Sequence, residues 1–172
     1  TWEKEEGEKV RLSAAATLTG FTGYAREVAE EWIAAFGAGD APFAVTAAPD
    51  TALPAEGYDI VLEADRIDVR YADERGGIYA ALTLRQLSEC GELFVGHLAD
   101  APDCAFRGYR VYLPGRNSMD AFRAMVDFIV YYKYNHISLE IGGAMEYKRH
   151  PEINARWAEF AADTHRYSDR AH

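Results

Sequence analysis

The stretch that decides the fold covers residues 106–141, FRGYRVYLPGRNSMDAFRAMVDFIVYYKYNHISLEI. It reads as a short strand, an amphipathic helix and a second short strand, which is the size and pattern of one βαβ unit. Ser118 lies at the expected N-cap, and Asp120 lies in the first turn, where a negative charge complements the helix dipole. The apolar residues of the helix recur at helical spacing: Phe122, Met125, Val126, Ile129 and Val130. A crossover helix of this length favours parallel strands, and the alternative is a helix between two antiparallel strands.

This unit also bears on the extent of the chain. A single βαβ unit cannot close a sheet or a barrel, because its strands keep unpaired edges. The sequence ends at His172, shortly after the second strand. We therefore expect the chain to be the front part of a larger protein, in which a second domain has only begun.

The charge balance argues against several classes of partner. The chain has 18 Lys and Arg against 28 Asp and Glu, a net charge of −10, with no block of basic residues. We therefore expect no nucleic-acid partner and no attraction to an anionic membrane. No apolar run approaches the roughly 20 residues that span a bilayer. The first residue is Thr1 and no signal peptide is visible, which leaves a cytoplasmic and a secreted location both open.

The composition also limits the chemistry. Apolar residues make up 49% of the chain, enough to build a folded core. Cys90 and Cys104 are the two cysteines, and no CxxC or His/Cys spacing surrounds them. We expect two free thiols, no structural metal and no cofactor.

The first hundred residues have the pattern of a compact α+β module. Strands are expected over residues 10–19, 43–47, 58–64, 67–71 and 93–98, of which 58–64 and 67–71 form a hairpin. A helix capped by Thr22 is expected to end before Gly37, and a second helix is expected from Gly76 to Ser88. Residues 100–103, around Pro102, form the best candidate linker.

Four segments resemble a known family. Gly57 and Tyr58, the strand 67–71 and the segment GIYAALTLRQL (77–87) resemble the small domain that precedes the catalytic barrel in family 20 glycoside hydrolases, the β-N-acetylhexosaminidases. The segment DAPDCAFRG (100–108) is similar to the start of barrel strand 1 in that family. YKYN (132–135) is similar to the end of barrel helix 1.

The resemblance implies a fold and a domain division. Residues 1–100 would be the N-terminal α+β domain, a sheet with two helices on one face, described in the family as zincin-like. Residues 101–172 would begin the TIM (β/α)8 barrel, truncated after its first β-α-β unit.

This chain departs from the family pattern at the ends of both barrel strands. Tyr112 stands where the family has an Asp, and the Arg that follows is displaced to Arg116. On the second strand, a His-x-His and a pair of Asp are replaced by Ser138, Glu140, Gly142 and Gly143. We interpret the chain as a divergent branch, and its sugar specificity stays open.

The resemblance implies substrate-assisted retaining hydrolysis, in which the 2-acetamido oxygen attacks the anomeric carbon. A Glu protonates the leaving oxygen and the preceding Asp orients the acetamido group, and this pair lies on a later barrel strand. Asp73 and Glu74 form the one Asp-Glu step here, and we interpret them as solvated loop charges. We therefore expect no catalytic residue in this chain. The parent protein would remove terminal β-linked N-acetylhexosamine, GlcNAc or GalNAc, and the piece alone would be inactive.

Two residues are candidates for substrate binding. Arg107 matches the family's Arg of strand 1, which binds ring hydroxyls, and the alternative is an Arg paired with an acid at the domain junction. Glu140 is expected at the carboxyl end of the second strand, where barrel active sites lie. The other charged or titratable residues are expected to be solvated or satisfied by hydrogen bonds: Glu146, Lys148, Arg149, His150, His97, His136, His165, Arg166, Arg170 and His172.

Two other readings stay open beside the hydrolase. The chain would also suit a non-catalytic carbohydrate-binding or assembly module, and it would then lack a catalytic role altogether. A metal-dependent hydrolase of the zincin type is disfavoured, because no HExxH motif is present. As a separate piece, the chain is expected to self-associate through residues 107–165, where an incomplete barrel would leave strand edges and apolar faces exposed.

Overall fold

The computed structural model describes residues 2–140 and 147–168. Two compact units form the chain, Thr1–Ala105 and Phe106–His172. Of the residues singled out above, Ile141, Gly142, Gly143, Glu146, Arg170 and His172 lie outside the described residues.

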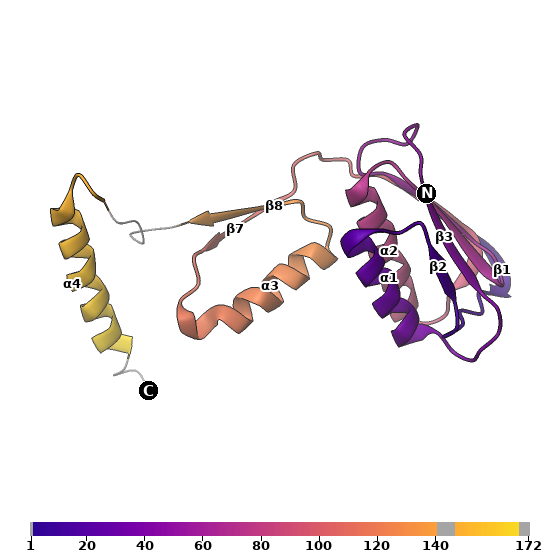
Figure 1. The fold of residues 1–172 in the computed structure, drawn as a ribbon, viewed down its shortest axis with the longest axis horizontal. Helices are drawn as coiled ribbons and strands as arrows, with labels where there is room; N and C mark the ends of the chain where they lie inside the picture. The colour runs from indigo at the N-terminus through magenta and orange to yellow at the C-terminus, as the bar shows by residue number, and fades with distance from the viewer. Residues whose placement is uncertain (1, 141–146, 169–172) are drawn as a thin grey trace. The chain divides into compact units, whose positions relative to one another are not determined.

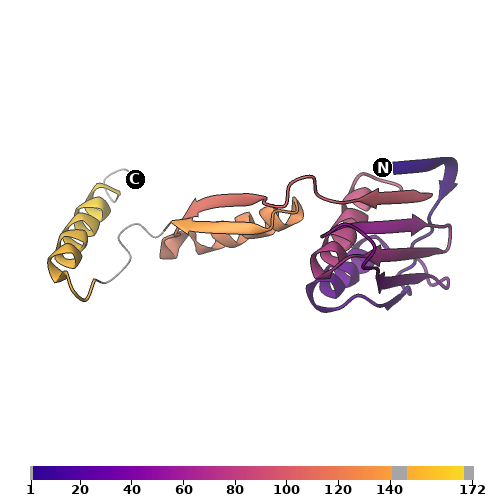
Figure 2. The same ribbon diagram turned by 90° about the horizontal axis from the view of Figure 1, so that it is seen from above.

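The first unit is a mixed six-stranded sheet with the order β1-β6-β4-β5-β3-β2. Its pairs β1–β6, β6–β4 and β4–β5 are antiparallel, and β5–β3 and β3–β2 are parallel. Helices α1 (Gly23–Phe36) and α2 (Glu74–Glu89) lie on one face of the sheet (Figures 1 and 2). The strands are β1 (Trp2–Lys9), β2 (Thr17–Thr19), β3 (Ala44–Pro49), β4 (Tyr58–Leu62), β5 (Arg66–Tyr71) and β6 (Phe94–Asp100).

The core of this unit lies between the sheet and the two helices. Alternate residues of a strand point to opposite faces, so one side of β4 and β5 is apolar and the other is polar. Trp32 of α1 is fully buried, and its Nε1 donates to Ser88 Oγ of α2 at 2.7 Å. This bond joins the two helices inside the apolar layer. The sheet contributes Val45, Tyr58, Ile60, Leu62, Ile67 and Val69 to that layer.

Helix α2 begins earlier than the sequence predicts, at Glu74 instead of Gly76. Asp73 is its N-cap, and the Asp73 carboxylate accepts from the backbone N–H of Gly76 at 2.9 Å and of Glu56 at 2.8 Å. Asp73 and Glu74 are exposed, as expected of solvated charges, but they belong to the start of α2 and not to a free loop. The Asp73 carboxylate satisfies backbone donors at the helix start and holds the preceding loop against it.

The expected strand over residues 10–19 is also wrong in part. The structure has an earlier strand, β1, and then an irregular connection to the three-residue β2. Val10 and Leu12 are buried in this connection, and the Val10 N–H donates to Leu93 O at 3.0 Å. Strand β1 is an edge strand of charged sequence, EKEEGEK, so its residues show no apolar alternation that would reveal it.

The second unit contains the parallel pair predicted from residues 106–141. β7 (Gly108–Tyr112) and β8 (His136–Glu140) pair in parallel, with Gly108 opposite His136 and Tyr112 opposite Glu140. This pairing excludes the antiparallel alternative. Helix α3 (Met119–Tyr131) runs alongside both strands (Figures 1 and 2), and α4 (Pro151–Ser168) follows later in the chain.

The two ends of α3 differ from the prediction in detail. Ser118 is the N-cap residue, but its side chain makes no capping hydrogen bond, because a short 3-10 helix (Arg116–Ser118) leads directly into α3. The helix ends at Tyr131, four residues before Asn135, which the sequence favours as the helix stop. Lys133 adopts a left-handed φ of 61°, and the Tyr134 N–H donates to Ile129 O at 3.0 Å, which closes the helix.

Within the described part of the chain, no helix is both long enough and apolar enough to cross a membrane.

Candidate functional site

The two-stranded sheet of the second unit has one face covered by α3 and one open face. Tyr109, Val111, Ile137 and Leu139 share the face toward α3: Val111 is half-buried, the other three remain exposed, and Tyr109 meets the ring of Tyr134 edge-on at 6.2 Å. We call the opposite side the open face; it consists of Gly108, Arg110, Tyr112, His136, Ser138 and Glu140. The open face is therefore largely polar, whereas the covered face is apolar.

An ion pair bridges the two strands across the open face. Arg110 Nη2 donates to Glu140 Oε2, so the guanidinium of β7 reaches diagonally to the last residue of β8. The Arg110 side chain is 70% exposed and the Glu140 side chain 35%. Tyr112, which lies opposite Glu140 in the register, is 71% exposed. Carboxylate, guanidinium and phenol thus lie together at the carboxyl end of both strands.

Arg107 lies at the other end of the same sheet. Its Nε donates to Lys133 O at 2.8 Å, and its backbone N–H donates to Asn135 Oδ1 at 2.9 Å. These bonds tie the start of β7 to the chain that leaves α3. Five residues of strand separate the levels of Arg107 and Glu140, about 16 Å at roughly 3.3 Å per residue. The structure does not bring the two candidate residues together.

Sequence reasoning overlooked Arg110. A period-2 reading of residues 108–112 places Arg110 on the same face as Tyr112, and that signal was available. The pairing of Arg110 with Glu140 could not be predicted from the sequence. This pairing depends on the register between two strands that are 28 residues apart at Gly108 and His136.

The histidines lie in separate surroundings. His97 Nε2 lies 2.7 Å from Asp59 Oδ2 on the side of the first unit's sheet away from the helices, and Arg70 Nη2 donates to Asp59 Oδ1 at 3.1 Å. Burial alone would raise the pKa of Asp59, but the hydrogen bonds from His97 and Arg70 outweigh it and hold the pKa below its usual range. His136 Nδ1 contacts Asn135 Oδ1 at 2.6 Å. His97 and His136 thus have the hydrogen-bond partners expected of them.

The charged segment after β8 is exposed where it is described. Lys148, Arg149 and His150 are exposed, as expected, and His150 Nδ1 lies 3.0 Å from Glu152 Oε1. His165 and Arg166 fall within α4. Among the described residues, no group of three or more His, Cys, Asp and Glu is placed to hold a metal ion.

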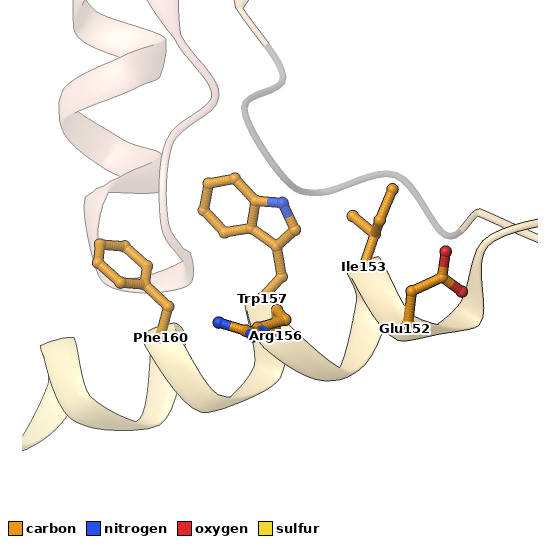
Figure 3. Close-up of a pocket in the computed structure, with 5 residues that line it drawn as sticks. All are labelled: Glu152, Ile153, Arg156, Trp157 and Phe160. Atoms are coloured by element: carbon orange, nitrogen blue, oxygen red, sulfur yellow. The ribbon is translucent and has the colours of Figure 1, made fainter.

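Helix α4 carries a stripe of apolar side chains along one side. Ile153, Trp157 and Phe160 line a hollow of about 500 Å³ together with Glu152 and Arg156, and Figure 3 shows the three apolar side chains projecting to the same side of the helix. Trp157 and Phe160 meet edge-on at 5.6 Å. Phe160 is 61% exposed. The three apolar side chains give this hollow the character of a packing surface, with Glu152 and Arg156 beside it.

A comparison with known protein families identifies the family of the first unit. The family model for domain 2 of glycosyl hydrolase family 20 matches residues 3–100. The chain belongs to glycosyl hydrolase family 20. The resemblance found in the sequence is thereby confirmed, and the mixed sheet with its two helices is the domain 2 of that family. A search of curated proteins found no match.

Solved structures of family 20 share the fold. A β-N-acetylhexosaminidase from Bacteroides fragilis NCTC 9343 superposes with a TM-score of 0.66 at 24% identity, over 88% of this chain and 34% of that one. A family 20 β-N-acetylglucosaminidase superposes with a TM-score of 0.69 at 21% identity, over 90% of this chain and 33% of that one. The family 20 β-N-acetylhexosaminidase from Streptomyces coelicolor A3(2) superposes with a TM-score of 0.63 at 18% identity, over 82% of this chain and 33% of that one. The chain thus spans about a third of the length of these structures.

Proposed function

We propose that this chain is part of a longer glycoside hydrolase that removes terminal β-linked N-acetylhexosamine. The observation that carries the proposal is the match of residues 3–100 to domain 2 of family 20, directly followed by a parallel β-α-β unit. Several solved proteins that share the fold are β-N-acetylhexosaminidases or β-N-acetylglucosaminidases. The proposed reaction is the substrate-assisted retaining hydrolysis that the family resemblance implies.

We further propose that residues 106–172 begin a TIM barrel. Parallel strands joined by a helix are the repeating unit of that fold. Among the described residues, Tyr24 and Phe36 are the exposed large hydrophobic side chains of the first unit. The second unit has many more: Phe106, Tyr109, Tyr112, Leu113, Met119, Phe128, Tyr132, Tyr134, Ile137, Leu139, Tyr147, Ile153, Trp157 and Phe160. Further barrel strands and helices would cover these side chains.

In this proposal the piece contributes binding surface and no catalytic acid. Asp73 and Glu74, the candidate Asp-Glu step, belong to the start of α2, and Asp73 is engaged with backbone N–H groups. The catalytic pair would lie on a later barrel strand of the parent protein. Glu140 keeps its proposed role in substrate binding, at the carboxyl end of the strand pair where barrel active sites lie. Arg107 lies at the opposite end, so its proposed role rests on the family resemblance alone.

The test is an assay of the parent protein and of this 172-residue chain side by side, with chromogenic β-GlcNAc and β-GalNAc substrates. We expect the parent to hydrolyse at least one of them and the chain to show no turnover above background. A parent that binds N-acetylglucosamine but hydrolyses neither substrate would favour the non-catalytic carbohydrate-binding module. Turnover by the chain alone would contradict the proposed location of the catalytic pair.

A further inference from the structure

The open face of the β7–β8 sheet has a composition that a barrel core does not need. In a closed barrel, helices cover one face of the strands and the other face points inward. Here α3 covers the face of Val111 and Leu139, so the open face would be the interior one. Interior positions of barrels are mostly filled by branched apolar residues. Arg110, Ser138 and Glu140 occupy them instead.

The Arg110–Glu140 pair has hydrogen-bonding capacity beyond its own contact. A guanidinium has five N–H donors and a carboxylate offers about four acceptor positions. Within the structure, one bond joins Arg110 Nη2 to Glu140 Oε2. Charge-assisted bonds of this kind are stronger than neutral ones, so the pair holds the carboxylate in a defined orientation. A neutral ligand with adjacent hydroxyl groups could use the remaining donors and acceptors of both side chains.

Tyr112 supplies the apolar part of such a site. It lies opposite Glu140 in the strand register, on the same face, and its side chain is 71% exposed. An aromatic ring offers a flat apolar surface together with a hydroxyl that bonds to polar groups. A pyranose ring has the matching chemistry, with hydroxyls around its edge and C–H groups on its faces. Small-molecule sites typically combine an apolar wall with a few placed polar groups.

We propose that Arg110, Tyr112 and Glu140 form a sugar subsite at the carboxyl end of β7 and β8. Glu140 accepts hydrogen bonds from ring hydroxyls, Tyr112 lies against the ring, and Arg110 is a positioning residue that holds the Glu140 carboxylate. The subsite takes a neutral sugar ring, since the charges of Arg110 and Glu140 offset each other. The proposal rests on the proposed function, because the open face points into the barrel only if the barrel exists.

The test uses kinetics of the parent enzyme on a chromogenic β-N-acetylglucosaminide. Glu140→Gln keeps the shape of the side chain and one acceptor oxygen but removes the charge. Arg110→Met keeps length and removes the donors. We expect each to raise KM by about tenfold or more, as for the loss of a charged hydrogen bond, with kcat within about threefold. Tyr112→Ala should raise KM as well, and Arg110→Lys should raise KM less than Arg110→Met does.

Two further variants separate binding from a structural role. Arg123 on α3 pairs with Asp120 at 2.9 Å on the exposed side of that helix, so Arg123→Met should leave KM and kcat unchanged. The exchange of Arg110→Glu with Glu140→Arg restores an ion pair with reversed polarity. We expect it to recover thermal stability but not KM. Recovery of KM as well, or a KM within twofold of wild type in both Glu140→Gln and Arg110→Met, would overturn the subsite.

The proposed subsite and the proposed reaction can be tested independently of each other. If the parent hydrolyses no β-N-acetylhexosaminide, the proposed function is wrong, and calorimetric titration of the parent with N-acetylglucosamine and with glucose then decides on the subsite. Binding that is lost in Glu140→Gln and kept in Arg123→Met supports it. The absence of binding to the wild-type protein overturns it.

Discussion

At the scale of single residues, Gly76 allows the first turn of α2 to approach the start of β4. A Cβ at this position would lie 2.5 Å from the backbone oxygen of Gly57, which a side-chain adjustment cannot relieve. The neighbouring Gly77 differs, because its Cβ would make ordinary contacts of 3.6 Å with the Tyr71 ring. Two adjacent glycines of one helix thus have opposite tolerance for a methyl group.

We expect Gly76→Ala to lower the free energy of unfolding by about 1–3 kcal/mol, the usual cost of overpacking. Gly77→Ala is the matched control. It should leave the free energy unchanged or raise it by up to about 1 kcal/mol, because Ala favours the helix. Urea denaturation of the chain ending at Ala105 measures both. Equal effects of the two substitutions would contradict the close approach at Gly76.

Asp59 makes the stability of the first unit depend on pH. Its side chain is 9% exposed and accepts from His97 and Arg70, and these bonds outweigh burial to lower its pKa. A carboxylate with a lowered folded-state pKa stabilises the fold above its unfolded pKa of about 3.9. That contribution is lost as the pH falls below about 3.9 and through the folded-state pKa.

We expect Asp59→Asn to lower the free energy of unfolding by about 1–3 kcal/mol at pH 7, because Arg70 and His97 lose a nearly buried, charged acceptor. The difference from wild type should shrink as the pH is lowered below about 4. Asp68→Asn is the control on the same sheet face, since Asp68 is 41% exposed and its ion pair with Arg66 should contribute less than about 1 kcal/mol. Denaturation curves between pH 3 and pH 7 test this. A constant difference across that range would contradict the role given to Asp59.

At the scale of elements, one buried hydrogen bond orients α1 against α2. Trp32 Nε1 donates to Ser88 Oγ, and Ser88 Oγ in turn donates to Leu84 O at 2.9 Å. Trp32 is fully buried and Ser88 is 5% exposed, so neither group has water as a substitute partner. The helix pair is therefore specified by a polar contact within an apolar layer.

We expect Ser88→Ala to cost about 1–3 kcal/mol, because it leaves the Trp32 N–H buried without an acceptor. Trp32→Phe should then cost less in the Ser88→Ala background than in the wild type. A double-mutant cycle from chemical denaturation gives the coupling energy, which should be about 1 kcal/mol. Additivity within about 0.3 kcal/mol would show that the bond contributes nothing to helix packing.

At the scale of the whole molecule, the two units differ in how completely they bury their apolar side chains. The first unit has a buried core on one side of a six-stranded sheet. The second has two strands, and α3 carries Phe128, whose ring contacts that of Tyr132 at 4.6 Å with more than half of each side chain exposed. Exposed apolar faces of this kind associate with other chains.

We expect the 172-residue chain to self-associate and a chain ending at Ala105 to be a folded monomer. Sedimentation velocity over a range of concentrations measures both. Phe128→Ser with Tyr132→Ser should weaken the association, whereas Arg123→Ser on α3 should not. A monomeric full chain at all concentrations, or an unfolded chain 1–105, would contradict this prediction.

The sequence by itself was sufficient for the local features and for the family. Helical spacing in residues 119–131 and the length of the crossover predicted the parallel pair β7–β8, and the segments at residues 57–58, 67–71 and 77–87 pointed to family 20. Alternation on both sides of Asp65 predicted the β4–β5 hairpin. These signals are readable because periodicity and turn residues act within a few positions along the chain.

Tertiary structure alone decided the features that depend on pairing across the chain. Strand β1 owes its place to its hydrogen bonds with β6, more than 80 residues later, and its charged sequence has no apolar alternation. Asp73 holds the preceding loop because the N–H of Glu56 lies beside its carboxylate. Arg110 reached Glu140, while Arg107 stayed at the opposite end, because of the register between β7 and β8. Such register is set by long-range hydrogen bonds and burial, and a one-residue shift would move every side chain to the other face.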